Sequence, residues 1–136
     1  MNYSAAGGCA CSTIRYELRQ KPLFVHGCHC SWCQRETGSA FAVNLLIESD
    51  QIGLVSGQTL TREITSSSGA GQTLVECPTC GVVVWSYYSS AAERIAFVRA
   101  GTLDDPSACP PDIHIFTETK QPWVELPKNV PAVPEY

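Results

Sequence analysis

The sequence has few charged residues and lacks any long hydrophobic run. Charged residues make up 16% of the 136 residues. No apolar stretch approaches the roughly 18 residues of a membrane-spanning helix. The first eight residues have neither a basic start nor an extended apolar segment, which argues against a secretory signal. We therefore expect a cytoplasmic protein without a transmembrane helix.

Basic residues are also scarce, and they form no cluster along the chain. Nine Lys and Arg residues stand against thirteen Asp and Glu residues, which gives a formal net charge of −4. An acidic chain without a basic patch is poorly suited to the phosphates of nucleic acids or to anionic membrane surfaces. We therefore expect neither nucleic acid nor membrane as a partner, while the oligomeric state stays open.

The length and the hydrophobic share of 44% fit one domain with a packed core, covering residues 1–136, with a proline-rich, extended tail over residues 127–136. Short apolar or alternating segments separated by Gly and Pro predict an all-β fold. The expected strands cover residues 13–18, 23–25, 41–47, 51–56, 60–65, 73–76, 82–88, 95–99 and 113–117. The expected helices are short and cover residues 31–36 and 89–93, and residues 66–71 form a surface loop.

Eight cysteines carry most of the chemical signal in this sequence. Seven of them fall into tight groups, which are Cys9/Cys11, Cys28/Cys30/Cys33 and Cys77/Cys80, and the eighth is Cys109. Structural disulfides are rare in the reducing cytoplasm, and closely spaced thiolates are typical of a shared metal ion. Cys109 lies among prolines, and we expect it to be a lone loop thiol.

The number of cysteines in each group suggests two zinc ions per chain. Cys9, Cys11, Cys77 and Cys80 supply the four thiolates of a closed structural zinc site. Cys28, Cys30 and Cys33 supply three, which leaves a position open for water or substrate, as in a catalytic zinc site. The alternative is that one of these groups is a redox couple or a set of buried thiols.

The three histidines are less informative than the cysteines. His29 lies between Cys28 and Cys30, and in an extended chain it points away from an ion that both of them share. His26 shares the face of Cys28, and we interpret His114 as a hydrogen-bonded core histidine rather than a wall of the active site.

The cysteine motifs and several later segments resemble the glutathione-dependent formaldehyde-activating enzyme family, which shares its domain with centromere protein V. The matching segments are residues 7–11 (GGCAC), 28–41 (CHCSWCQRETGSAF), 77–81 (CPTCG), 101–104 (GTLD), 114–116 (HIF) and Trp123. The chain departs from the family pattern at Ser12, where Gly is usual, and at Glu76, where an aromatic residue is common. Neither departure is expected to affect a metal ligand.

This resemblance implies a β-tent fold of stacked antiparallel sheets, a structural zinc at Cys9, Cys11, Cys77 and Cys80, and a catalytic zinc at Cys28, Cys30 and Cys33. It also implies a carbon–sulfur lyase that joins glutathione and formaldehyde into S-hydroxymethylglutathione, or acts on a related thiol–aldehyde adduct. A non-catalytic zinc-binding interaction module and a thiol or zinc redox sensor are the alternatives.

Glutathione is an anion, so an acidic protein needs a local cation and local hydrogen-bond donors to bind it. Arg35 is the cation nearest to the three-cysteine group in sequence, and Thr37, Gly38 and Ser39 follow it with hydroxyl and amide donors. We therefore expect Arg35, Thr37, Gly38 and Ser39 to bind the substrate, with a solvent-exposed charge and a simple turn as the alternative interpretations.

Overall fold

The computed structural model describes residues 3–66, 69–88 and 93–136 of the chain. It consists mainly of β-strands, which confirms the all-β prediction. The strands are β1 (Ala5–Gly8), β2 (Arg15–Leu18), β3 (Phe24–Cys28), β4 (Ala42–Glu48), β5 (Ile52–Ser56), β6 (Leu60–Ile64), β7 (Gln72–Glu76), β8 (Val83–Tyr88), β9 (Ile95–Arg99) and β10 (Ile113–Ile115). The helical elements are α1 (Ser31–Thr37) and the short 3-10 helices η1 (Ser49–Gln51), η3 (Ala100–Thr102), η4 (Pro106–Ala108) and η5 (Thr117–Thr119).

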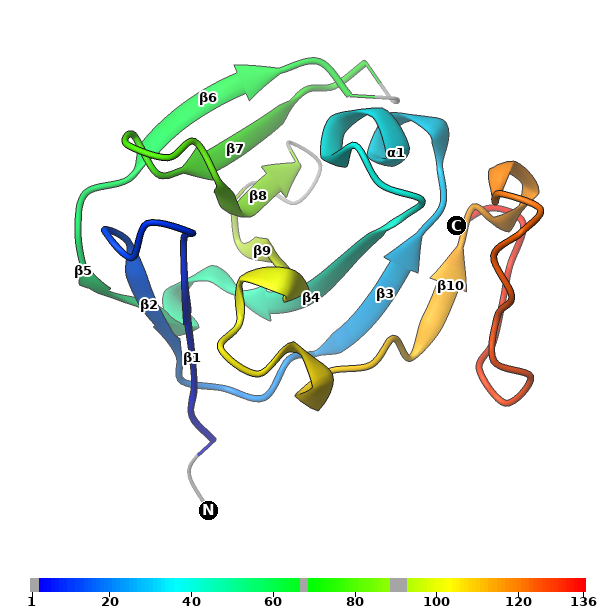
Figure 1. Cartoon of the computed structure of the whole chain (residues 1–136), viewed down its shortest axis with the longest axis horizontal. Helices are drawn as coiled ribbons and strands as arrows, with labels where there is room; N and C mark the ends of the chain where they lie inside the picture. The colour runs from blue at the N-terminus through cyan, green and yellow to red at the C-terminus, as the bar shows by residue number, and fades with distance from the viewer. Residues whose placement is uncertain (1–2, 67–68, 89–92) are drawn as a thin grey trace.

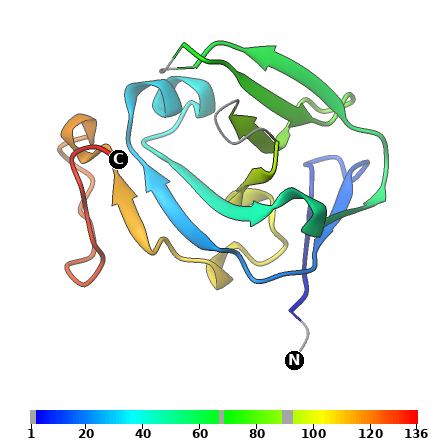
Figure 2. The same cartoon turned by 180° about the vertical axis from the view of Figure 1, so that it is seen from behind.

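The strands form two sheets, one with three strands and one with seven. The small sheet has the order β1-β2-β5, and the large sheet has the order β10-β3-β4-β9-β8-β7-β6. All neighbours are antiparallel except β10 and β3, which run parallel. Figures 1 and 2 show the large sheet curving from β6 round to β10, with α1 near β7 at one end of the curve.

Alternation along the strands of the large sheet separates two environments. On β4, Leu45 and Ile47 are fully buried and belong to the main core. The same core contains Tyr16 of β2, whose ring meets Trp85 of β8 edge-on at 5.7 Å between ring centroids. The main core therefore lies where residues of the small and large sheets pack together, which leaves the other side of β3, β4 and β9 available to form a site.

Most expected strands are present with boundaries within two residues of the prediction, and residues 95–99 coincide with β9. The segment at 23–25 extends further than expected, to Cys28. Strand β1 was not predicted, because Ala5–Gly8 contains only small residues and shows no apolar alternation. The expected helix at 31–36 is α1, whereas residues 89–92 of the other expected helix and part of the loop at 66–71 lie outside the described residues. None of the described helices is long and apolar enough to cross a membrane.

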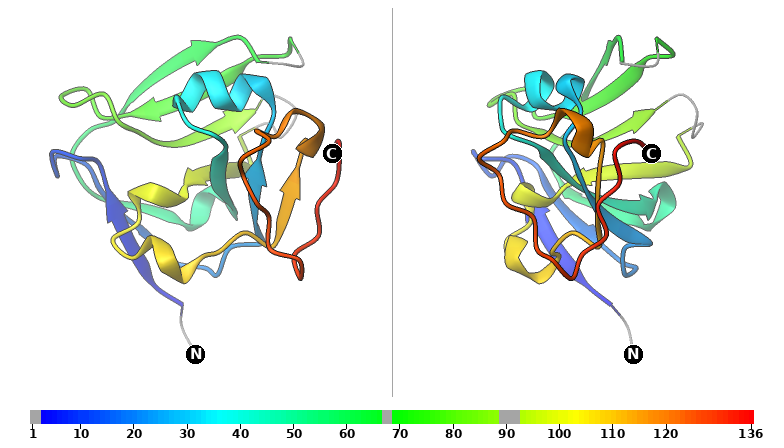
Figure 3. Two further views of the ribbon diagram at one scale, coloured as in Figure 1. Left: turned by 45° about the vertical axis from the view of Figure 1, so that its right-hand side comes forward. Right: turned by 90° about the vertical axis from the view of Figure 1, so that its right-hand side faces the viewer.

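The C-terminal tail runs beside β10. His114 pairs with Ala132 in a parallel bridge, the Val133 amide donates to the His114 carbonyl, and the Thr117 amide donates to the Val133 carbonyl. Figure 3 shows this segment following β10 along the side of the molecule. The tail therefore extends the edge of the large sheet by one bridge. It also places Tyr136 near α1 and the three-cysteine group.

Candidate metal centres

The first cysteine cluster joins the two sheets. Cys9 follows β1, Cys11 lies in the turn before β2, and Cys77 and Cys80 lie between β7 and β8. Their sulfur atoms all lie within 4.8 Å of one another. In the sequence, strands β2 to β7 lie between Cys9 and Cys77. The cluster therefore has the membership that the sequence predicted, and it fastens the β1–β2 turn to the β7–β8 turn.

The sulfur–sulfur spacing in this cluster suits a tetrahedral metal ion. Cys11 Sγ lies 3.6 Å from Cys9 Sγ and 3.7 Å from Cys77 Sγ. Four sulfurs at about 2.3 Å from a zinc ion form a tetrahedron with edges of about 3.8 Å. Because disulfide sulfurs lie about 2 Å apart, these thiols are not bonded to one another. The donor set and its spacing therefore fit zinc.

Backbone amides donate hydrogen bonds to several of the sulfurs in this cluster. The Ile14 amide donates to Cys9 Sγ at 3.2 Å, and the Thr79 amide donates to Cys77 Sγ at 3.4 Å. Hydrogen bonding from the Val82 amide is the main cause that lowers the pKa of Cys80, to about 6. N–H donors stabilise the negative charge of a thiolate, and the thiolate is the form of cysteine that binds a metal ion.

A left-handed backbone conformation on each side of the cluster turns the chain around the sulfurs. Gly81 adopts φ 78°, and its amide donates to the Cys77 carbonyl at 2.9 Å. Ser12 adopts φ 67°, a conformation that glycine takes with less strain. The position at which the family usually has Gly is thus one where the backbone favours Gly. Glu76, the second departure, forms an ion pair with Arg62 at 2.8 Å.

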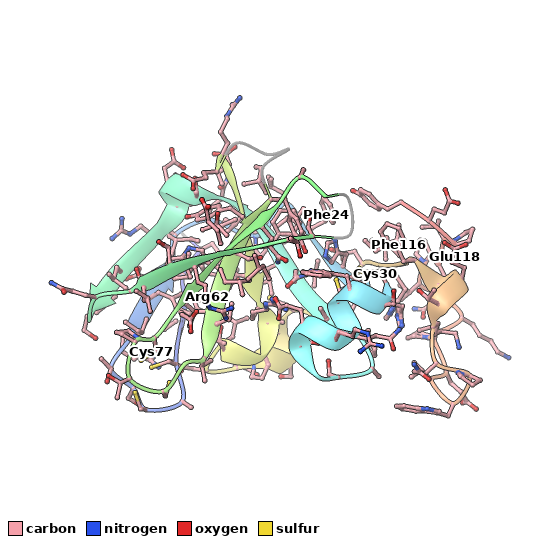
Figure 4. All side chains as sticks on the ribbon, turned by 90° about the horizontal axis from the view of Figure 1, so that it is seen from above. Phe24, Cys30, Arg62, Cys77, Phe116 and Glu118 are labelled. Atoms are coloured by element: carbon pink, nitrogen blue, oxygen red, sulfur yellow. The ribbon has the colours of Figure 1, made fainter. Side chains whose placement is uncertain are left out.

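The second cluster is built at the junction of β3 and α1. Cys28 ends β3, Cys30 caps α1, and Cys33 lies in the first turn of the helix. Cys28 Sγ lies 3.3 Å from Cys33 Sγ, and the Cys33 amide donates to Cys30 Sγ at 3.3 Å. All three sulfurs lie within 4.8 Å of one another. Figure 4 shows Cys30 well separated from Cys77, so the two clusters are independent sites.

Without a cation, the second cluster favours one thiolate rather than three. A hydrogen bond from Cys28 is the main cause that lowers the pKa of Cys30. The same network raises the pKa of Cys28 to about 11, chiefly through its hydrogen bond to Cys30, and it raises the pKa of Cys33 through Cys28. Three thiolates at this spacing repel one another, so all three ionise together only around a positive ion.

The histidines beside the second cluster form a separate buried pair. His29 is fully buried, and its Nε2 lies 2.9 Å from Nδ1 of His114. The His29 ring also stacks on the Phe41 ring, with 4.4 Å between the ring centroids. His29 is outside the group of sulfurs that lie within reach of one ion, as predicted from its position between Cys28 and Cys30. His114 is a hydrogen-bonded buried histidine, in line with the interpretation chosen above.

A cavity of about 430 Å³ opens next to the second cluster. Its lining combines three cysteines with six aromatic rings, and the lining residues are His26, Cys28, Cys30, Trp32, Cys33, Leu46, Ser66, Tyr88, Phe97, Ile115, Phe116 and Tyr136. Among the described residues, the lining contains no cysteine of the first cluster. The second cluster therefore borders a space of ligand size.

His26 lies in the wall of this cavity on β3, opposite Asn44 on β4. Its Nε2 lies 3.1 Å from Asn44 Nδ2, and burial lowers the pKa of His26 to about 4. The imidazole is therefore neutral at pH 7. It stands between the rings of Phe24 and Phe97, at 6.2 and 5.9 Å between ring centroids. His26 contributes an uncharged aromatic wall beside the thiols.

The residues predicted to bind substrate lie elsewhere on α1 and the turn that follows it. Arg35 is exposed, and neither it nor Thr37, Gly38 or Ser39 is among the described residues that line the cavity. Thr37 donates to the Cys33 carbonyl at 2.7 Å, and Gly38 ends the helix at φ 66°. Ser39 donates to the Phe41 carbonyl at 2.9 Å. Their contacts are thus those of a helix end, and substrate binding by them stays a prediction.

Sequence reasoning missed the aromatic wall of the cavity. Tyr88, Phe97, Phe116 and Tyr136 come from β8, β9, the end of β10 and the tail, so no local motif connects them. The alternation along β9 contained a partial signal. Phe97 lies on the face opposite to the buried residues Ala96 and Val98, and such a face needs its own covering.

Comparison with known proteins gives the family. A crystal structure of a Rhodobacter sphaeroides protein superposes with a TM-score of 0.53 at 17% identity, covering 76% of this chain and 93% of that chain, which supports the fold alone. A curated protein of Halomonas elongata is 27% identical over 127 residues, covering 88% of this chain and 79% of its own length. That protein carries the provisional name of glutathione-dependent formaldehyde-activating enzyme. The family model described as glutathione-dependent formaldehyde-activating enzyme matches residues 4–119. The chain therefore belongs to the glutathione-dependent formaldehyde-activating enzyme family.

Proposed function

We propose that this chain is a zinc-dependent carbon–sulfur lyase that forms or cleaves a glutathione–aldehyde adduct or a related thiol–aldehyde adduct. The observation that carries the proposal is the position of Cys28, Cys30 and Cys33, which are grouped within reach of one ion and also line a cavity of about 430 Å³. Family membership supports glutathione-related formaldehyde chemistry.

Two zinc ions per chain are proposed, and their roles differ because of their surroundings. Cys9, Cys11, Cys77 and Cys80 would hold a structural ion with four thiolates, and Cys28, Cys30 and Cys33 would hold a second ion with three. When bound in the second site, zinc supplies a Lewis acid that lowers the pKa of a coordinated thiol and stabilises negative charge.

The chain itself contributes positioning and the exclusion of water. In the forward direction a carbon–sulfur bond forms while the carbonyl double bond opens, and the proton of the thiol ends on the carbonyl oxygen. No oxidant or reductant is needed. The cavity wall at Leu46, Ile115 and Phe116 places the reacting groups beside the three sulfurs, and bringing both reactants together supplies an entropic advantage.

The Cys33→Ser variant tests this proposal. We expect it to lose turnover of the thiol–aldehyde adduct by at least about 100-fold, because one of the three ligands is lost, while far-UV circular dichroism stays native. The zinc content measured by metal analysis should fall from two equivalents per chain toward one. Cys109→Ser is the matched control, since Cys109 is buried but belongs to neither cluster among the described residues. Full activity of the Cys33→Ser variant would refute the catalytic assignment.

A further inference from the structure

Apart from the three cysteines, the described lining of the cavity beside the second cluster offers no charged side chain to a ligand. Among the described residues, its lining contains no Lys, Arg, Asp or Glu, and five of the twelve lining residues are Trp, Tyr or Phe. The residues outside the described ranges are Met, Asn, Ser and Ala, whose side chains are also uncharged. A charged ligand group inside this space would therefore lose its hydration without gaining an ion pair, which is costly.

Three cations on the surrounding elements do not line this cavity among the described residues. Arg99 of β9 forms an ion pair with Glu36 of α1, and both side chains are nearly buried, at 13% and 12% exposure. Lys120 Nζ donates to the carbonyls of Gln121 and Val124 at 3.0 and 2.7 Å. Arg35 of α1 is exposed and is not part of the described lining. The two carboxylates of glutathione thus find no complementary charge in the cavity.

The rings that line the cavity come from separate elements and support one another. Tyr88 and Phe97 meet edge-on at 4.8 Å between ring centroids, and Phe97 meets His26 at 5.9 Å. Phe116, which follows β10, adds a wall near Cys30, and Figure 4 shows these two labelled residues close together in projection. Aromatic walls at these separations favour a flat, apolar ring, which gains stacking and edge-to-face contacts.

We infer that the adduct handled by this chain carries an uncharged, ring-bearing apolar group that fills this cavity, so that an aryl-substituted thiol or aldehyde is preferred over glutathione and formaldehyde. The inference rests on the proposed function for the chemistry at the three cysteines, and it goes beyond that function in naming the substrate class. The reaction remains the balanced addition described above, in which the carbon–sulfur bond forms and the thiol proton passes to the carbonyl oxygen.

Binding measurements on the zinc-loaded protein test the substrate class separately from turnover. We expect benzyl mercaptan to bind at least about 10-fold more tightly than glutathione in isothermal titration calorimetry, because both present a thiol but only the first presents a ring. Toluene, which has no sulfur to bind the metal, should also bind, with ligand-observed NMR as the readout. Tighter or equal binding of glutathione would overturn the inference.

Variants of the wall identify the cavity as the binding place. Phe116→Ala should weaken the binding of benzyl mercaptan by about 10-fold and weaken the binding of glutathione much less, because only the first thiol presents a ring to the Phe116 side chain. Phe97→Leu, which keeps an apolar side chain in the packed wall, should give a smaller loss and remain folded by circular dichroism. Trp123→Ala is the control, since Trp123 is 71% exposed and lies outside the described lining. An equal effect of Phe116→Ala on both thiols would contradict the inference.

Turnover distinguishes a failure of the inference from a failure of the proposed function. Turnover of glutathione with formaldehyde at higher kcat/KM than benzyl mercaptan with benzaldehyde would overturn the inference and support the proposed function. Binding of benzyl mercaptan without turnover of any thiol–aldehyde pair would overturn the proposed function and support the apolar binding site.

Discussion

At the scale of single residues, Gly27 shows how closely the histidine pair packs against β3. A Cβ atom at position 27 would lie 2.7 Å from His114 Nδ1 and 2.9 Å from its Cε1. The absence of a side chain therefore allows His114 to approach the strand and reach His29. Gly27 directly precedes Cys28, so His114 packs against the strand next to the second cluster.

The Gly27→Ala substitution should destabilise the protein by about 1–3 kcal/mol, because the buried imidazole has to move. Urea denaturation of the zinc-saturated protein measures the loss. Gly101→Ala is the matched control, since a Cβ atom there meets nothing within 4 Å, and it should change stability by no more than about 0.5 kcal/mol. Equal stability of the Gly27→Ala variant and the parent would contradict the proposed packing.

Tyr16 makes stability depend on pH in the alkaline range. Burial is the main cause that raises the pKa of Tyr16 from 10.0 to about 12, and its hydroxyl lies 2.7 Å from Thr102 Oγ1. Because the unfolded chain ionises first, this contribution is complete below pH 10 and is lost as the pH rises to about 12. Two pKa units correspond to about 2.7 kcal/mol.

Denaturation midpoints between pH 8 and 12 check this prediction. The Tyr16→Phe variant should start less stable by about 1 kcal/mol, since it loses the hydrogen bond, and should then lose stability more slowly with rising pH. Tyr136→Phe, at an exposed position, should follow the parent. Parallel curves for the parent and the Tyr16→Phe variant would show that Tyr16 does not cause the slope.

At the scale of elements, the placement of α1 depends on polar contacts with the large sheet. Glu36 pairs with Arg99 of β9, and Trp32 Nε1 donates to Gln72 Oε1 of β7 at 3.1 Å. Gln72 in turn donates to Ser86 Oγ at 3.2 Å. These contacts hold the helix that carries Cys33 against the curved sheet, so they position one cysteine of the second cluster.

The Glu36→Ala substitution should cost about 3–5 kcal/mol, because it leaves the nearly buried charge of Arg99 unpaired. Arg62→Ala is the comparison, since the Arg62 side chain is 54% exposed and its pair with Glu76 should contribute no more than about 1 kcal/mol. Thermal denaturation of both variants gives the difference. A loss at Glu36 no larger than that at Arg62 would mean that the ion pair is not what holds α1.

At the scale of the whole molecule, the four-cysteine cluster connects the small sheet to the large one. The β1–β2 turn contributes Cys9 and Cys11, and the β7–β8 turn contributes Cys77 and Cys80. A metal ion in this position closes a long loop of the chain. Metal binding of this kind supplies on the order of 10 kcal/mol in small zinc peptides, which is comparable with the whole stability of a domain.

The Cys80→Ser substitution should therefore unfold the protein or lower its melting temperature severely, whereas Cys30→Ser should leave it folded. Mild chelation of the parent should remove about one of two zinc equivalents first, from the three-cysteine site with its open position. Circular dichroism and metal analysis measure the two effects. Equal destabilisation by both substitutions, or simultaneous loss of both ions, would contradict the division into a structural and a catalytic site.

Cysteine spacing and strand alternation determined much of this protein without any tertiary information. Cys77 and Cys80 lie three residues apart and Cys28, Cys30 and Cys33 within six, so short-range geometry groups them in any fold that accommodates the turn. The all-β class follows in the same way from apolar alternation such as that of residues 95–99, because side-chain direction alternates along an extended chain.

The tertiary structure alone decided what surrounds the second cluster. Phe97, Phe116 and Tyr136 converge on Cys30 from three separate elements, and the parallel pairing of β10 with β3 brings His114 to His29. These contacts depend on the curvature of the sheet and on pairing between segments far apart in the chain, which no local pattern encodes. The grouping of the cysteines can therefore be predicted from short segments, whereas the chemical character of the cavity emerges only when the strands assemble.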